Sequence, residues 1–279
     1  MKKLKNPFPE MTELLEYQFF RFALIGVAIL SVAAGILGCY IVSRRLVSIS
    51  GGITHSCFGG LGLGYYLGWS PVGLATVFAV ASALGVQLLS RGGRVREDSA
   101  VAVVWAAGMA VGVTFVFLTP GAVPELNSFL FGNILTITPS ALLWMAAFTA
   151  CLIAFVSCFF RKIAACAFDP DFARVAGVKV GLYNGLMMIF VAVGIVLMIR
   201  CVGMMLLMSM LTLPPMVAEL FTSRLGRMIP LSVAVSVGGC VCGLFLASAI
   251  NVPASALIVA VQVGIYILAQ IVAHLRKKA

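Results

Sequence analysis

The sequence predicts an all-α, polytopic membrane protein with eight or nine transmembrane helices. Of its 279 residues, 62% are hydrophobic and 10% are charged, whereas a soluble domain is roughly half apolar and a quarter charged. Apolar runs of about 18 residues or more recur along the chain, and a helix needs this length to cross a bilayer. We expect one transmembrane domain over residues 1–279, because no polar stretch is long enough to form a second, soluble domain.

The basic residues are distributed as in a multi-pass membrane protein and not as in a nucleic-acid-binding protein. The formal net charge is +10, but the Lys and Arg residues lie in short clusters between the apolar runs. Such clusters mark cytosolic loops, and they lie at 44–45, 91–96, 161–179, 224–227 and 276–278. The chain then starts outside the membrane, crosses it nine times and ends on the cytosolic side, or crosses it eight times if one segment is re-entrant.

Each expected span is bounded by charges or by helix-breaking residues. Residues 1–20 mix Phe and Leu with acidic residues, so we expect an interfacial helix there. Arg44 and Arg45 end the first span, and a Trp-Ser-Pro turn at 69–71 follows the second. The spans are expected at 21–42, 50–68, 72–89, 100–118, 139–160, 182–199, 201–221, 230–249 and 254–273.

Three shorter features complete the expected organisation. Residues 124–138 are apolar but interrupted, which favours a short, partly inserted helix at the outer face. Residues 164–180 form the longest internal break and contain Asp169-Pro170-Asp171, a carboxylate cap followed by Pro in the first turn. Gly177 is expected to end this short cytosolic helix. Asp98 or Ser99 is expected to cap the fourth span.

The second span carries the candidate functional group. Its small residues recur every four positions and form one ridge of a helix: Gly52, Ser56, Gly60, Gly64 and Gly68. In lipid, such a ridge lets two helices approach closely. His55 lies beside this ridge, and a titratable group at membrane depth is a functional candidate. The alternative is a histidine that donates to a backbone carbonyl and serves packing only.

The residue inventory argues against enzyme chemistry. The chain has 9 acidic residues and 2 His, and it contains no HExxH, GxSxG or Walker A motif. Its 8 Cys and 13 Met lie mostly in apolar runs, where they are expected to fill space. We therefore expect movement of a solute, with no permanently bound cofactor. An ATP-driven role would need a partner subunit, for which the 164–180 helix is a docking candidate; alternatively, that helix only joins two spans.

Six segments, in order, carry a resemblance to a known family. They are QFFRFAL (18–24), VSRRLVSISGGITHS (42–56), REDSAVAVVWAAG (96–108), ELNSFLFGNIL (125–135), FDPDFARVAGV (168–178) and MLLMSMLTLPPMVAELFTSRL (205–225). The chain resembles, nearly end to end, the integral-membrane permease of the ABC-3 family of importers for zinc, manganese or iron. This resemblance implies a lipid-embedded homodimer with cytosolic ATPase subunits that bind ATP and an extracytoplasmic metal-binding protein, and no nucleic acid.

The resemblance also implies roles for individual residues. The cytosolic helix matches the family's coupling helix, which contacts the ATPase through Asp169, Phe172, Arg174 and Gly177. Glu125 and Asn133 lie in the segment at the outer face, where the binding protein would make contact.

The sequence departs from the family at one important position. The family has an Asp four residues before its His, and this chain has Gly51 there. Thr54, Ser50 or Glu219 could substitute for it, two copies of His55 could meet across the dimer, or the cargo could differ from a bare metal ion. The alternatives in other classes are a transporter or scaffold of the same ancestry with a non-metal cargo, and an ATP-independent secondary carrier.

Overall fold

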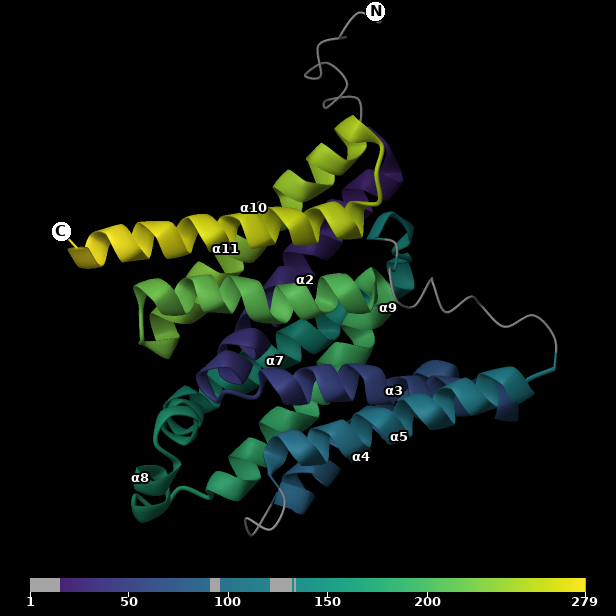
Figure 1. The fold of residues 1–279 in the computed structure, drawn as a ribbon, viewed down its shortest axis with the longest axis horizontal. Helices are drawn as coiled ribbons and strands as arrows, with labels where there is room; N and C mark the ends of the chain where they lie inside the picture. The colour runs from purple at the N-terminus through teal and green to yellow at the C-terminus, as the bar shows by residue number, and fades with distance from the viewer. Residues whose placement is uncertain (1–15, 91–95, 121–131, 133, 279) are drawn as a thin grey trace, which may run out of the picture. The chain divides into compact units, whose positions relative to one another are not determined.

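The computed structural model describes residues 16–90, 96–120, 132 and 134–278, and every regular element in these ranges is a helix (Figure 1). The chain divides into two compact units. Unit 1 contains residues 1–36, 127–149 and 200–279, and unit 2 contains residues 37–126 and 150–199. The expected interfacial helix at 1–20 lies mostly outside the described residues, as does most of the expected helix at 124–138.

Unit 2 contains the candidate pathway and coupling segments. The second half of α2 (Gln18–Ser43) leads into α3 (Val47–Leu67), α4 (Pro71–Ser90) and α5 (Glu97–Leu118). The rest of this unit is formed by the end of α7 (Pro139–Phe168), by α8 (Pro170–Val175) and by the start of α9 (Val180–Phe221). The helix α3 packs against both α4 and α5.

Unit 1 holds the remaining helices. It contains the start of α2, the short η1 (Ile134–Thr136), the start of α7 and the second part of α9. It is completed by α10 (Leu225–Ile250) and α11 (Ala254–Lys278), which pack against each other. Buried polar groups in this unit bond to one another: Ser209 donates to Gln262 (2.6 Å), and Ser236 to Ser31 (3.0 Å). Such pairs link helices in a medium that offers no water.

The expected membrane spans are recovered as helices. Among the described residues, seven helices are long and apolar enough to cross a membrane, and α9 is one of them with 42 residues. A straight helix of that length would extend about 63 Å, twice the roughly 30 Å of a hydrocarbon core. Counting α9 as two segments and including the glycine-rich α3 gives the nine spans of the prediction.

Two helix breaks differ from the predicted positions. In α9 the non-helical residue is Gly203 (φ 77°, ψ 170°), close to the predicted break at Arg200, and the helix continues through Pro214 and Pro215. The helix α7 does not stop at Arg161 but runs to Phe168, with one non-helical residue at Phe159 (φ −113°, ψ 16°). The helix therefore bends its backbone at Phe159 and continues where an end was expected. It continues because the following residues Ile163, Cys166 and Ala167 are buried and keep the helix packed.

All eight cysteines are free, and five of them are buried. They are Cys39, Cys57, Cys166, Cys201 and Cys240.

Candidate functional site

His55 lies on α3 and stacks against an aromatic side chain of α5. Its ring centroid is 4.4 Å from that of Trp105, and the two rings are 8° from parallel. The His55 side chain is half-buried, and its Nδ1 is buried without a hydrogen-bond partner. No protein group therefore uses this ring nitrogen, which in a neutral imidazole either donates or accepts a hydrogen bond.

Thr54 and Ser50 belong to the same helix as His55, but their hydroxyl protons are already used. Thr54 Oγ1 donates to the Ser50 carbonyl at 2.7 Å, and Ser50 Oγ donates to the Val47 carbonyl at 2.8 Å. Both side chains are buried, with an exposed fraction of 0%. Within the described residues, no group of three or more His, Cys, Asp and Glu side chains could hold a metal ion.

The other predicted pathway and outer-face residues belong to different parts of the chain. Glu219 is an exposed residue of α9 in unit 1, whereas Thr54 and His55 belong to unit 2. Glu125 and Asn133 lie outside the described residues.

The predicted ridge of small residues on α3 is divided between two neighbouring helices. A Cβ on Gly52 would lie 2.6 Å from Val101 Cγ1 of α5, and the backbone at Ser56 meets Gly108 of α5. Gly60 meets the Leu74 and Ala75 backbone of α4, and a Cβ on Gly64 would lie 2.6 Å from Pro71 Cα. Such contacts leave no room for a side chain, so backbone approaches backbone along this seam.

Gly68, the last residue of the predicted ridge, has a different role. It is the C-cap of α3 with a left-handed backbone (φ 68°, ψ 17°), and nothing lies within 4 Å of where its Cβ would be. Glycine adopts this conformation without steric cost, so Gly68 ends the helix instead of packing in the seam.

The sequence reasoning missed a second row of glycines that brings α3 close to α5. A Cβ on Gly59 would lie 2.8 Å from the Gly108 carbonyl oxygen, and Gly62 meets the Gly112 backbone. Gly108 and Gly112 are themselves four residues apart on α5, and this spacing was a signal available in the sequence. Trp105, three residues before Gly108, is placed beside α3 by this close approach.

The predicted cap of α5 is not observed. The N-cap residue is Arg96, and no side chain caps the helix. Asp98 instead accepts a hydrogen bond from Ser48 Oγ (3.1 Å), so the carboxylate ties the first turn of α5 to the first turn of α3.

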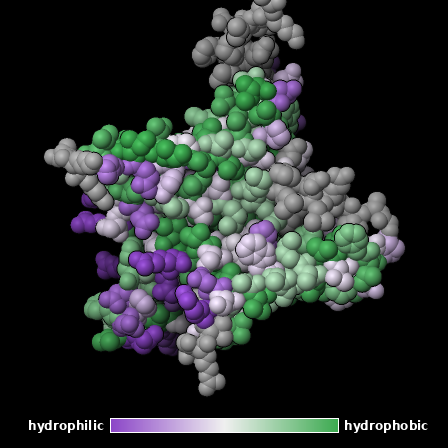
Figure 2. All heavy atoms as spheres, viewed as in Figure 1, coloured by the Kyte–Doolittle hydropathy of each residue, from purple (hydrophilic) through white to green (hydrophobic). Residues whose placement is uncertain are grey.

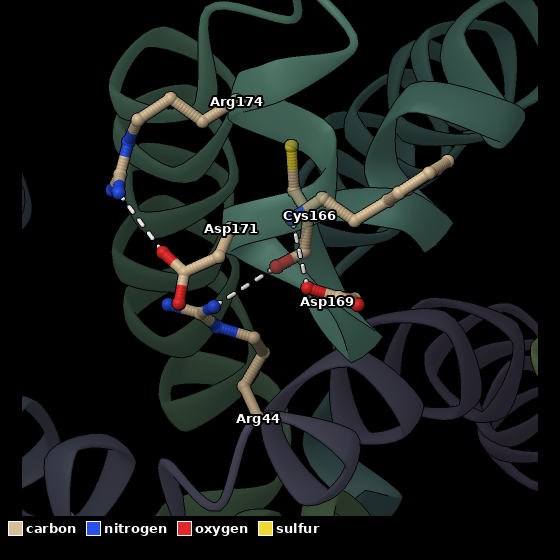
Figure 3. Close-up of polar contacts among 6 residues, drawn as sticks. Arg44, Cys166, Asp169, Asp171 and Arg174 are labelled. Atoms are coloured by element: carbon tan, nitrogen blue, oxygen red, sulfur yellow. Dashed lines mark hydrogen bonds and ion pairs between the residues drawn. The ribbon is translucent and has the colours of Figure 1, made fainter.

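The short helix α8 has the predicted capped form (Figure 3). Asp169 Oδ1 accepts from the Phe172 N–H at 2.9 Å, and Pro170 begins the helix. Arg174 pairs with Asp171 (2.9 Å) on the exposed side of the helix. Gly177 follows with a left-handed φ of 78°. Figure 2 shows hydrophilic residues gathered around α8, as expected for a segment outside the hydrocarbon region.

One side of α8 is anchored and the other is free. Ala173 is fully buried in a cluster with Cys166 and Val180. Phe172 is 65% exposed and Val175 is 89% exposed. Residues three apart on a helix share a face, so Phe172 and Val175 are exposed on the same face of α8.

Arg44 links the turn before α3 to the end of α7. Its Nη1 donates to the Cys166 carbonyl at 2.9 Å, in the last turn of α7 and three residues before the Asp169 cap (Figure 3). A cation at this position also interacts favourably with the helix dipole. The turn itself is tight, because Arg45 has a left-handed φ of 58° and the Leu46 N–H donates to the Ile41 carbonyl at 2.8 Å. A continuous path therefore runs from α8 through Arg44 to α3.

Comparison with known proteins agrees with this arrangement. The sequence profile of the ABC 3 transport family matches residues 16–273. The chain belongs to the ABC 3 transport family. It is 34% identical over 229 residues to a probable metal transport system membrane protein of Chlamydia pneumoniae, covering 80% of this chain and 78% of the relative.

Two further relatives of this ABC 3 member cover nearly the whole chain. It is 28% identical over 257 residues to the manganese transport system membrane protein MntC of Halalkalibacterium halodurans, covering 92% of this chain and 88% of that one. Its fold matches PsaBC from Streptococcus pneumoniae, solved in complex with a Fab, with a TM-score of 0.82 and 25% identity, covering 93% of this chain and 95% of that one.

Family membership settles the general role of the chain. It is a multi-pass permease subunit in the inner membrane. It is not an enzyme, because ATP hydrolysis in such an importer belongs to a separate subunit. The sequence-based prediction of the ABC-3 family and of an all-α membrane fold is confirmed.

Proposed function

We propose that this permease carries a divalent transition metal ion across the membrane and that His55 contacts the ion on its way. Manganese is the first cargo to test, because relatives at 28% identity are named manganese transport proteins; zinc and iron follow. The observation that carries the proposal is the half-buried His55 on α3, whose Nδ1 is buried and unpartnered. Imidazole is a common ligand of zinc and iron, and manganese, which favours oxygen ligands, would be bound by it more weakly.

A single imidazole suits a transported ion better than a full set of ligands would. A site in a conducting pathway must attract the ion and still release it. Gly51 leaves the position one turn before His55 without a carboxylate, so the metal would be bound weakly within one copy of the chain. We also propose that two copies assemble into the transporter, so that both His55 side chains serve one pathway.

The helix α8 is the proposed docking element for the ATPase subunit. Its exposed Phe172 and Val175 would enter a groove of that subunit, while the buried Ala173 fixes the helix to unit 2. Movement of α8 would reach α3, and therefore His55, through α7 and the bond from Arg44 to the Cys166 carbonyl. A metal-binding protein outside the membrane would deliver the ion to the opposite face.

The test is metal uptake into proteoliposomes that contain the chain, its ATPase and its binding protein, with manganese, zinc and iron in competition. His55→Ala should lower uptake by about tenfold or more, the range measured when a metal site loses a supporting group. His274→Ala is the matched control, because His274 is exposed near the end of α11. Normal uptake by His55→Ala, at equal amounts of protein in the membrane, would contradict the proposed role.

A further inference from the structure

The Trp105 indole lies flat against the His55 imidazole, with centroids 4.4 Å apart and planes 8° from parallel. The two residues come from α5 and α3, and the glycine contacts between these helices fix the distance between their backbones. Trp105 is 44% exposed, so one side of the indole is against His55 and part of it is open. Among the described residues, Trp105 is the one aromatic side chain stacked on His55.

A metal-binding histidine usually has its ring oriented by a hydrogen bond from its second nitrogen to a carboxylate or carbonyl. The Nδ1 of His55 has no such partner. The residue one helical turn earlier, where a carboxylate could reach the ring, is Gly51. The ring orientation therefore depends on stacking, which restricts rotation about the bond between Cβ and the ring.

The indole also has an electrostatic effect on a loaded imidazole. An imidazole that binds a metal cation, or a proton, carries positive charge, and the face of an aromatic ring attracts a cation. Trp is the most effective side chain for this attraction. The stacked indole therefore favours the charged, occupied form of His55 over the empty form.

We propose that Trp105 is a positioning residue for His55. It fixes the orientation of the imidazole ring and stabilises the metal-bound state of His55, as a neighbouring carboxylate would do in another metal site. This inference rests on the proposed pathway role of His55. It makes Trp105 a determinant of how tightly the cargo ion is bound, separate from the seam glycines that determine how closely the helices pack.

The first experiment measures manganese uptake in the complete reconstituted transporter. Trp105→Ala should raise the half-saturating manganese concentration about tenfold with little change in the maximal rate, because a second group that orients a metal ligand contributes about that much. Trp105→Phe, which keeps an aromatic face, should remain within about threefold of the wild type. In the Trp105→Ala background, Gly51→Asp should recover much of the lost affinity, since its carboxylate can reach His55.

The second experiment does not depend on the folding of a Trp105 variant. The chain has 3 Trp, so Trp69→Phe combined with Trp144→Phe leaves Trp105 as the single fluorophore. Manganese, a paramagnetic quencher, should reduce its emission in a saturable manner, and His55→Ala should abolish this effect. Zinc, which is diamagnetic, serves as the comparison ion.

The outcomes separate the two proposals. Suppose that His55→Ala stops uptake. If Trp105→Ala then leaves the half-saturating manganese concentration unchanged, or if Trp105 emission does not respond to manganese, the positioning role is overturned and the pathway role stands. If His55→Ala transports normally, both proposals fall. Equal losses of maximal rate in Trp105→Ala and Trp105→Phe would identify Trp105 as a packing residue and overturn the inference.

Discussion

The cap of α8 offers a sharp test of the coupling proposal. The helix has 6 residues, and an isolated helix of this length is not stable in water. Two features hold it in the protein: the 2.9 Å bond from the Phe172 N–H to Asp169 Oδ1, and the burial of Ala173 against Cys166 and Val180. Asp169→Ala removes the first feature and leaves the second.

Loss of such a cap costs about 1 kcal/mol, which lowers the ratio of ordered to disordered helix about fivefold. We expect the amount of ATP hydrolysed per metal ion transported to rise about threefold to fivefold in Asp169→Ala. Asp169→Asn should remain close to the wild type, because Asn caps as well as Asp. Phe172→Asp keeps the cap but removes the exposed apolar contact, so it should uncouple hydrolysis from transport more completely.

The assay is simultaneous measurement of metal uptake and phosphate release in proteoliposomes, with hydrogen exchange at α8 as the structural readout. Faster exchange in Asp169→Ala with an unchanged ratio of hydrolysis to transport would mean that an ordered α8 is not needed for coupling. Equal defects in Asp169→Ala and Asp169→Asn would assign the effect to the charge and refute the argument from the cap.

Two further predictions test the path and the seam. Arg44→Gln should reduce coupled transport about tenfold while basal ATP hydrolysis continues, because a hydrogen bond from a charged group contributes about 1.5–3 kcal/mol. Arg44→Lys should have an intermediate effect. Equal transport by the wild type, Arg44→Gln and Arg44→Lys would contradict the link to Cys166. Gly60→Ala should lower the thermal stability of the detergent-solubilised protein, because its Cβ would meet the Leu74 backbone. Gly85→Ala is the control, with nothing within 4 Å of its Cβ, and an equal effect of both substitutions would exclude a steric cause.

The sequence was sufficient for the features that depend on composition and local chemistry. Hydrophobic runs predicted the helices, and the Asp169-Pro170 pair predicted the capped α8, because a cap is formed by residues close in sequence. The spacing of Gly52 to Gly64 marked a face with almost no side chains. Which helix covers each part of that face depends on tertiary packing, and the division between α4 and α5 was not predicted.

The missed features share a physical reason. The stacking of Trp105 on His55, the bond from Arg44 to the Cys166 carbonyl and the bond from Ser48 to Asp98 all join residues that are 50 or more positions apart. No local pattern marks such contacts. The Asp98 cap prediction was wrong for the same reason: a local rule favoured the backbone of α5 as the partner, and the approach of α3 offered Ser48 instead.

In the proposed mechanism, the position of His55 on α3 would connect metal binding with movement. The helix α3 is joined at its start to α7 through Arg44 and to α5 through Ser48 and Asp98, while farther along it meets its neighbours through glycines. Many of these contacts are to backbone atoms, as at Leu74, Gly108 and Gly112, so few side chains interdigitate and small displacements along the seam need few side-chain rearrangements. The helix α3 is therefore suited to transmit a displacement from α8, because hydrogen bonds attach its first turn and glycine contacts line the rest of it. Because the stacked Trp105 belongs to the facing helix α5, such a displacement would change the overlap of the two rings and so the hold of His55 on its ion.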